Sequence, residues 1–581
     1  MRKNKTPMLA LLATLFTSAA FCADGANPNV LFIAVDDLKP WLGCYDHPVV
    51  QTPNIDRLAK AGTVFRNTYC QVALCGPSRM SCYTGRYVSS HGATANFVPL
   101  RVGERNIGDH LKPLGMRPVL VGKTHMIPDQ EGMKRLGIDP TGPLGMHHSQ
   151  IGFEPYERDD GIHPDAVLKP NVAYNKYLKE RGYDDHENPW HWAANSVDRD
   201  GEVRSGFFND VAASPARVTD EESETPYMTR RAMQFLEEDD GEKPWCLHLS
   251  YIKPHWPYIA PAPYNDMYSA AEVQPVHSSE KERENTNPLA QHFQERICGR
   301  TFSKEEARET VIPAYMGLIK QIDDQLGVLF EFMEQKDLMK DTMIVFTSDH
   351  GEYFGDHWMG DKDFFHDPAV KVPLIIFDPD TSCDSTRGTV QNAPVEAIDL
   401  LPTFATLSGP KPRDERAIDG VNQLDFILGK SKTARKSYIY NPGSASVQTR
   451  ILQGNAIREG DWKLISPLKV GMFLEDSGSG KWELYNLKED IGETTNLALK
   501  YPQKVKRLKA ILKSSEEKFR NLFENSNDII TVSNFEGVIL DINKKALETY
   551  GTKYEDIVGK SSFELIPEKY HEKITESLKD I

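Results

Sequence analysis

The chain has 581 residues, a formal net charge of −16 at pH 7 and 26% charged residues. This length exceeds that of one ordinary domain and predicts one large α/β unit with smaller additional parts. The composition is typical of a soluble globular protein, and the acidity argues against a nucleic-acid-binding surface. It does not exclude an anionic substrate, because a local group of cations can outweigh a diffuse negative surface.

The first segment, residues 1–23, has the layout of a secretory signal peptide. Three basic residues precede an apolar run over 8–21, and small residues follow. The run is too short for a comfortable membrane span. We therefore expect a periplasmic or secreted protein with no transmembrane helix after cleavage. A lipoprotein anchor at Cys22 is a minor alternative, because Phe21 is larger than the residue expected before such a cysteine.

Four short apolar runs, each followed at once by polar residues, predict the central sheet. Continuous apolar runs of this length are typical of strands buried on both faces, in a parallel sheet covered by helices. Ligands bind beyond the carboxyl ends of such strands, so the polar clusters are expected to meet. The runs are 30–35 before Asp36 and Asp37, 119–121 before Lys123 and His125, 247–251 before His255, and 343–346 before Asp349 and His350.

The pattern between and after these runs predicts the domain organisation. Apolar residues at helical spacing predict helices over 54–61 and 313–335, within a catalytic domain over 28–410. Residues 411–512 differ, because their short alternating runs predict a small antiparallel subdomain closed by a helix. Its predicted strands lie within 447–457, 462–465 and 482–485, and its closing helix within 501–512.

The last part, residues 513–581, has a third pattern. It predicts a helical face through 519–523, a hairpin around 534–537 and a short helix that ends near Gly551. This α+β arrangement resembles the first half of a PAS sensory domain. The later strands of a complete PAS sheet are not present before the chain stops.

The most informative motif is CGPSR at 75–79, followed by TGR at 84–86. Pro77 suits the first turn of a helix, with Cys75 just before it and Gly85 as its stop, so the sulfur would face unpaired N–H groups. The ordinary alternative is a buried free cysteine before a helix. Two specified groups at a fixed spacing favour a functional site. The motif resembles the maturation signature of the sulfatases, in which this cysteine becomes 3-oxoalanine (formylglycine).

The resemblance to the sulfatase and phosphonate monoester hydrolase superfamily covers most of 29–512. It implies an alkaline-phosphatase-like fold and a sulfuric ester hydrolase. Residues 29–45 look most similar to the iduronate-2-sulfatase branch. Residues 122–126 and 349–357, with Asn96, look closer to phosphonate monoester hydrolases, so the assignment to a branch is mixed.

By this resemblance, Asp36, Asp37, Asp349 and His350 would bind one divalent cation, with the modified Cys75 completing the shell. Such an oxygen-rich set suits Ca²⁺, and one imidazole also admits Mn²⁺. The two adjacent aspartates alone would equally suit a solvated turn. The metal site is favoured because the other acidic residue and the histidine follow a second strand.

The resemblance assigns catalytic roles to the other polar residues. Arg79 and Lys123 would hold the aldehyde hydrate, and His125 would move its proton. On the other side of the substrate, Lys362 would bind sulfuryl oxygens and His255 would protonate the leaving alkoxide. An isolated lysine or loop histidine is often only structural, so these roles depend on position at the strand ends. The predicted substrate-binding residues are Asn96, Lys123, His255 and Lys362.

The expected chemistry explains the need for an aldehyde. One hydroxyl of its hydrate attacks sulfur, and deprotonation of the other expels the anion, an exit that serine lacks. Expected partners are a sulfated carbohydrate or small organic sulfate and a formylglycine-generating enzyme. The alternatives are a phosphonate monoester or phosphodiester hydrolase and, from a different class, a PAS-type sensor with a regulated hydrolase region.

Several residues receive no functional prediction. His357, His366 and Lys371 are expected to be structural. The sequence does not decide how the remaining cysteines pair in an oxidising compartment; they are Cys44, Cys70, Cys82, Cys246, Cys298 and Cys383.

Overall fold

The computed structural model describes residues 28–96, 98–161, 172–186, 190–284, 288–407, 418–431, 435, 437–440, 452–453, 455–467, 469–470, 482–524, 531–533 and 539–560. The predicted signal peptide and Cys22 lie outside these residues. Within them, no helix combines the length and the apolar character that crossing a membrane requires.

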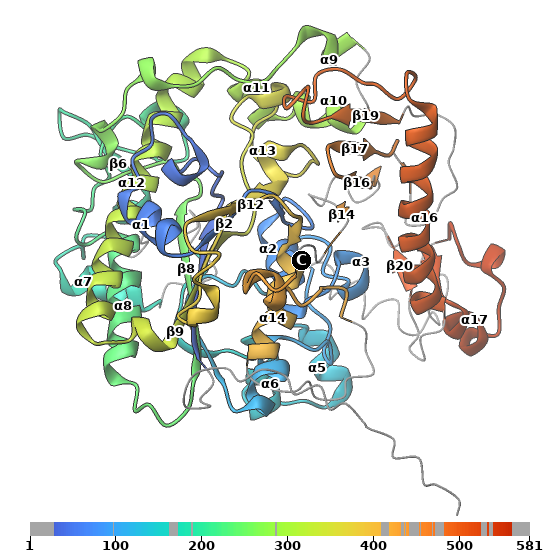
Figure 1. The fold of residues 1–581 in the computed structure, drawn as a ribbon, viewed down its shortest axis with the longest axis horizontal. Coiled ribbons are helices and arrows are strands. Elements are labelled where there is room, and N and C mark those ends of the chain that lie inside the picture. Colours follow the sequence, from blue (N-terminus) through green and yellow to red (C-terminus); the bar gives the residue numbers. More distant parts are fainter. Residues whose placement is uncertain are drawn as a thin grey trace, which may run out of the picture.

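A central eight-stranded sheet organises the predicted catalytic domain (Figure 1). Five adjacent strands are parallel: β9 (Thr342–Ser348), β1 (Asn29–Asp36), β8 (Trp245–Pro254), β4 (Arg117–Gly122) and β5 (Glu154–Arg158). Beyond β9 follow β11 (Leu374–Phe377), which is antiparallel to both its neighbours, then β2 (Thr63–Phe65) and β12 (Thr389–Gln391). The predicted mostly parallel sheet is confirmed.

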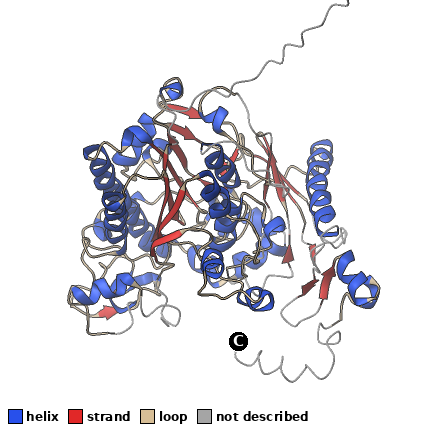
Figure 2. Cartoon of the chain, turned by 90° about the horizontal axis from the view of Figure 1, so that it is seen from below, coloured by secondary structure: helices blue, strands red, loops and turns tan. Residues whose placement is uncertain are grey.

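Both faces of the sheet are buried under helices, as Figure 2 shows. Successive side chains of a strand point to opposite faces, so alternate residues of β1 enter two different cores. Leu31 and Ile33 join the core with α1 (Pro53–Ala61), α8 (Glu224–Glu238) and α12 (Glu305–Gln335). Val30 and Phe32 join the core with α2 (Cys75–Thr84), α4 (Ile107–Leu111) and α14 (Leu400–Leu407). The predicted helix over 313–335 begins earlier, at Glu305, because Pro313 is accommodated inside it.

A smaller antiparallel sheet follows in the chain, as predicted. Its order is β14 (Ser437–Tyr440), β16 (Ala456–Glu459), β17 (Trp462–Ile465) and β19 (Glu483–Asn486). The helix α16 (Pro502–Glu524) packs on it through Leu508 and Leu512. The predicted closing helix over 501–512 therefore continues to Glu524, since no glycine or proline between 513 and 524 stops it. Residues 447–451 of the predicted strands lie outside the described residues.

The tail contains the predicted hairpin and short helix, beside the C-terminal end of α16 (Figure 1). β20 (Thr531–Ser533) pairs with β21 (Ile539–Ile542) in antiparallel fashion. Next in the chain is α17 (Lys544–Tyr550), which ends at Gly551 with a left-handed φ of 64°. The side chains over 519–523 and residues 561–581 lie outside the described part. The domain boundaries at 410, 512 and 513 remain predictions.

Candidate active site and metal centre

The carboxyl ends of four neighbouring parallel strands bring the predicted site residues together. β1 ends at Asp36, β9 is followed by Asp349 and His350, β4 leads to Lys123, and β8 leads to His255. These strands are adjacent in the order β9, β1, β8, β4, although they are far apart in the sequence. The sheet therefore gathers the polar clusters at one edge, where α/β proteins bind ligands.

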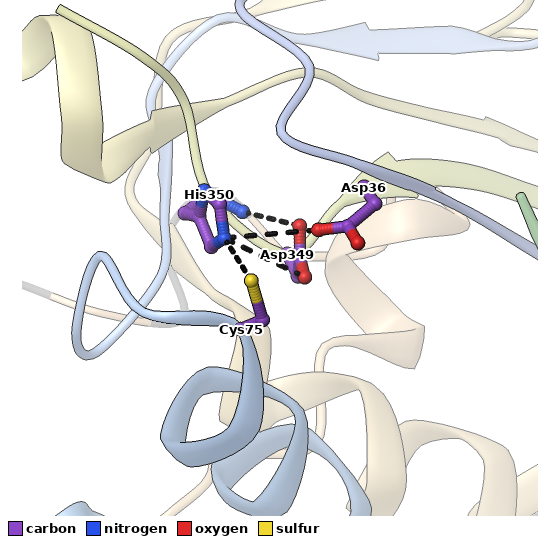
Figure 3. A group of neighbouring side chains, drawn as sticks. All are labelled: Asp36, Cys75, Asp349 and His350. Atoms are coloured by element: carbon purple, nitrogen blue, oxygen red, sulfur yellow. Dashed lines mark hydrogen bonds and ion pairs between the residues drawn. The ribbon is translucent and has the colours of Figure 1, made fainter. Parts of the chain in front are cut away.

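Cys75 lies in the first turn of α2 and faces this edge of the sheet. It is the first residue of the helix and not, as predicted, the residue before it. Gly85 ends the helix with a left-handed φ of 65°, as its position predicted. The Cys75 side chain is buried, and its Sγ lies 3.0 Å from Nε2 of His350. Figure 3 shows Cys75, Asp36, Asp349 and His350 pointing toward one another.

These four residues form a group that can hold a metal ion. Their donor atoms all lie within 4.8 Å of one another, and all four residues are buried. Oδ1 of Asp36 has no hydrogen-bond partner in the described part of the chain. A buried carboxylate oxygen without a partner is costly, and a bound cation satisfies it. Two carboxylates and an imidazole fit a divalent cation, and these donors alone do not decide which one.

The imidazole of His350 is oriented for this purpose. Its Nδ1 lies 3.0 Å from the carbonyl oxygen of Gly351, which can only accept a hydrogen bond. In the neutral ring the proton is therefore on Nδ1, and the Nε2 lone pair faces Cys75. Asp37 lies at the other ring nitrogen, with Oδ1 3.2 Å from Nδ1. The predicted ligand Asp37 thus lies next to the group of four, and its Oδ1, like that of Asp36, has no hydrogen-bond partner among the described residues; its role as a ligand stays a prediction.

Two buried cations hold the carboxylates. Arg79 donates from Nε to Oδ2 of Asp349 at 2.8 Å and from Nη1 to Oγ of Ser250 at 2.7 Å. Lys123 forms an ion pair with Asp36 through Nζ. Burial by itself raises the pKa of Asp36, but the nearby positive charges, with Lys123 first among them, lower it well below its ordinary value. Asp36 is therefore ionised at neutral pH and able to bind a cation.

Two further contacts fix the first turn of α2. The Ser78 hydroxyl donates to the carbonyl oxygen of Asp349 at 2.6 Å. Oδ1 of Asn96 accepts from the backbone N–H of Gly76 at 2.9 Å. The structure therefore places Asn96, predicted to bind substrate, against the helix backbone next to Cys75.

His125 lies in a strained turn that an acidic residue holds. Its φ of 53° is in the left-handed region, which is uncommon for residues other than glycine. Oδ1 of Asp160 accepts from the backbone N–H groups of Thr124 and His125, both at 2.9 Å, and Arg158 pairs with the other oxygen at 2.9 Å. Burial, followed by the charge of Lys123, lowers the pKa of His125 well below its ordinary value, so the ring is neutral.

Lys362 lies beside Asp37, and the ring of His255 lies within reach of the charges of Lys362, Asp36 and Asp37. Nδ1 of His255 is 2.6 Å from the carbonyl oxygen of Trp256, so the neutral ring carries its proton on Nδ1 and leaves Nε2 free to exchange a proton. Burial, followed by the charge of Lys362, lowers the pKa of His255 to about 3. Nζ of Lys362 lies 3.4 Å from Oδ2 of Asp37.

The sequence pattern did not indicate two of the residues that support the site, Asp160 after β5 and Ser250 within β8. Lys253 belongs to the polar cluster of His255, but the pattern predicted no role for it. No spacing along the chain links Asp160 to His125, because the two residues follow different, neighbouring strands, β5 and β4. His357 and His366, expected to be structural, stack with ring centroids 3.7 Å apart. Each cysteine in the described part of the chain is a free thiol.

Comparisons with known proteins agree with this arrangement. The model of the sulfatase family matches residues 28–410. The model of the C-terminal part of N-sulphoglucosamine sulphohydrolases matches 355–521, and the PAS fold model matches 517–580. The last two matches overlap within α16. The predicted resemblance of the tail to a PAS domain is confirmed.

Individual relatives cover most of the chain. A multifunctional alkaline phosphatase superfamily protein of Trinickia caryophylli is 32% identical over 436 residues, which cover 71% of this chain and 79% of the relative. An N-acetylglucosamine-6-O-sulfatase of Bacteroides thetaiotaomicron is 25% identical over 541 residues, covering 90% and 92%. The solved structure of a phosphonate monoester hydrolase of Agrobacterium radiobacter has a TM-score of 0.68 and 25% identity, covering 83% of this chain and 95% of its own. These matches confirm the predicted alkaline-phosphatase-like fold.

Proposed function

The chain belongs to the sulfatase family, and we propose that it hydrolyses sulfate esters of carbohydrates or small organic alcohols. The reaction takes place between the N-terminus of α2 and the carboxyl ends of β1, β4, β8 and β9. One observation carries this proposal: the Cys75 thiol is buried among Asp36, Asp349 and His350, with its sulfur 3.0 Å from the imidazole. That position suits a reactive group formed from the thiol better than a packing residue.

Two groups that the family uses fit this site. Formylglycine, made from Cys75 by a maturation enzyme, supplies a hydrated aldehyde with one hydroxyl for attack on sulfur and a second for release of sulfate. A divalent cation would be held by Asp36, Asp349 and His350, with the neighbouring Asp37 as the fourth predicted carboxylate or histidine ligand, and would supply positive charge to stabilise the sulfate ester. We propose Ca²⁺, with Mn²⁺ as the alternative, because carboxylates dominate the donor set.

The side chains on the α2 side hold charge and move a proton. Lys123 and Arg79 keep the carboxylates of Asp36 and Asp349 ionised and in place. Because the ring of His125 is neutral and its buried Nδ1 has no hydrogen-bond partner among the described residues, it can accept a proton during release of sulfate.

The side chains on the opposite side bind the ester and protonate the leaving group. Lys362 is buried next to Asp37, and we propose that its ammonium group binds sulfate oxygens. His255 keeps one proton on Nδ1 and takes a second on Nε2 when an anionic ester binds beside it, since a nearby negative charge favours the imidazolium. The Nε2 proton then goes to the leaving alkoxide.

Mass spectrometry of the peptide that spans residues 69–86 tests this proposal, on protein made in a host that has the maturation enzyme. Conversion of Cys75 to formylglycine, together with turnover of aryl and alkyl sulfates, is the expected result. If the aldehyde forms and the protein hydrolyses phosphonate esters but no sulfate ester, the function is phosphonate hydrolysis and the sulfatase proposal is wrong. A thiol that stays unmodified beside a modified control sulfatase would overturn it.

The place of action is part of the same proposal. We propose export to a periplasm or secretion, because residues 1–23 have the pattern of a signal peptide. Cell fractionation, with sequencing of the mature N-terminus, tests this, and a cytoplasmic protein that keeps its first residues would refute it.

A further inference from the structure

Lys253 is a buried lysine that folds back onto its own loop. It lies near the end of β8, two residues before His255, and 7% of its surface is exposed. Its Nζ donates to the carbonyl oxygen of Pro257 at 2.7 Å and lies 3.4 Å from the carbonyl oxygen of His255. The ammonium therefore gathers two carbonyl groups that flank Trp256.

The carbonyl group between these two, that of Trp256, binds the imidazole of His255 and not the ammonium. The carbonyl oxygen of Trp256 accepts from Nδ1 of His255 at 2.6 Å, which sets both the orientation of the ring and the position of its proton. The ammonium of Lys253 thus holds carbonyls 255 and 257, while carbonyl 256 holds the imidazole. Without Lys253, carbonyl 255 loses this donor and carbonyl 257 keeps only the backbone N–H of Ile259 at 2.9 Å, so the two carbonyl groups are no longer held together and the hydrogen bond to the ring loses its geometry.

Burying an ammonium group at this position costs desolvation free energy, which a purely packing role would not offset. In the described part of the chain, Lys253 makes no ion pair, and burial lowers its pKa to about 8 against the opposing charges of Glu224 and Asp36. An apolar side chain of similar length would fill the same space without desolvating a charge. Carbonyl oxygens, by contrast, can be gathered only by a donor.

We propose that Lys253 is a positioning residue that directs Nε2 of His255 at the leaving oxygen, and that the site therefore supplies the acid catalysis that esters of alcohols need and esters of phenols do not. As the S–O bond breaks, the Nε2 proton passes to the leaving oxygen, the alcohol departs neutral, and His255 returns to the neutral ring. An alkoxide is a poor leaving group and needs this proton, whereas a nitrophenolate leaves without it. This inference depends on the proposed role of His255.

The test is the dependence of kcat/KM on the leaving group. A nitrophenyl sulfate and an alkyl sulfate are compared in the wild-type protein and in the variants Lys253→Met, Lys253→Gln and His255→Ala. Loss of His255 lowers kcat/KM for the alkyl ester by about 10²- to 10⁴-fold, the range of general acid catalysis. Lys253→Met lowers it by about 10- to 100-fold, and by no more than about 2-fold for the nitrophenyl ester, because it misplaces the acid without removing it.

Two further variants separate positioning from a loss of structure. Lys253→Gln keeps an N–H donor and recovers part of the alkyl activity. In the double variant with His255→Ala, Lys253→Met adds no further loss that depends on the leaving group, because the residue it positions is gone. Lys320→Met, which removes a similarly buried lysine from α12, leaves the ratio of the two activities unchanged.

Equal losses on both esters, or an additional alkyl-specific loss in the double variant, would overturn the proposal. The same comparison is run on aryl and alkyl phosphonate esters. Turnover of these alone would refute the sulfatase function, while the ratio of alkyl to aryl activity would still decide the role of Lys253.

Discussion

Replacing Asp160 by alanine tests whether the strained turn at His125 serves the reaction. The carboxylate accepts two backbone N–H groups at 2.9 Å, and one of them belongs to His125 itself, which has a left-handed φ of 53°. Without the acceptor, the turn can relax to an ordinary backbone conformation. His125 then leaves the position from which it exchanges a proton.

The size of the effect follows from these contacts. A hydrogen bond to a charged group contributes about 1.5–3 kcal/mol, and a strained backbone conformation of this kind costs about 1–3 kcal/mol. The Asp160 side chain is 11% exposed, so water can replace part of the lost bonding. We therefore take about 2 kcal/mol, the value of one such hydrogen bond after partial replacement by water, which at about 1.4 kcal/mol per factor of ten lowers the population of the native turn, and with it kcat, by about 30-fold.

The assay is rapid mixing with a nitrophenyl sulfate. Because His125 acts in release of sulfate and not in attack, Asp160→Ala is expected to keep the first burst of nitrophenol and to slow the steady state. The matched control is Asp160→Asn, whose amide oxygen can still accept both N–H groups and which stays within about 3-fold of wild type. The reasoning is refuted if the alanine variant keeps the wild-type kcat, or if both variants lose the same activity and the burst.

Three other perturbations have defined outcomes. Cys75→Ser is expected to release about one alcohol per chain and then stop with the serine covalently sulfated, which intact-mass measurement detects; repeated turnover by this variant would refute the need for an aldehyde. Chelation of divalent cations is expected to abolish activity and lower the melting temperature, and addition of Ca²⁺ or Mn²⁺ is expected to restore both. In the control variant Asp36→Asn, the chelator should change neither quantity. A wild-type protein that is insensitive to the chelator would exclude a metal at this site. Truncation after Glu524 is expected to leave activity and melting temperature unchanged, because Leu508 and Leu512 of α16 remain packed. A loss of activity would instead favour a regulatory role for the tail.

Much of this architecture could be predicted because its causes are local in the chain. The apolar runs that became β1, β4 and β9 have no polar residue to face solvent, so they required burial on both faces. The position of Gly85 predicted the end of α2, since few other residues adopt its left-handed conformation without strain. Pro313 did not mark the start of α12, because a helix that is packed in the core tolerates the loss of the one hydrogen bond that a proline removes.

The sequence by itself determined which chemical groups the site would have. The motif around Cys75, through its resemblance to the sulfatase signature, predicted a modified cysteine, and the acidic residues after two strands predicted a metal site beside it. Only the tertiary structure decided how these groups are oriented: it put Nε2 of His350 toward Cys75, and Asp37 at the other nitrogen. It also brought Asp160 to the turn of His125 and the ammonium of Lys253 to the loop of His255. The contacts of His350, Asp37 and Asp160 depend on strand order across the sheet, and the contact of Lys253 depends on the direction that its side chain takes within its own loop. No pattern along the chain encodes either of them.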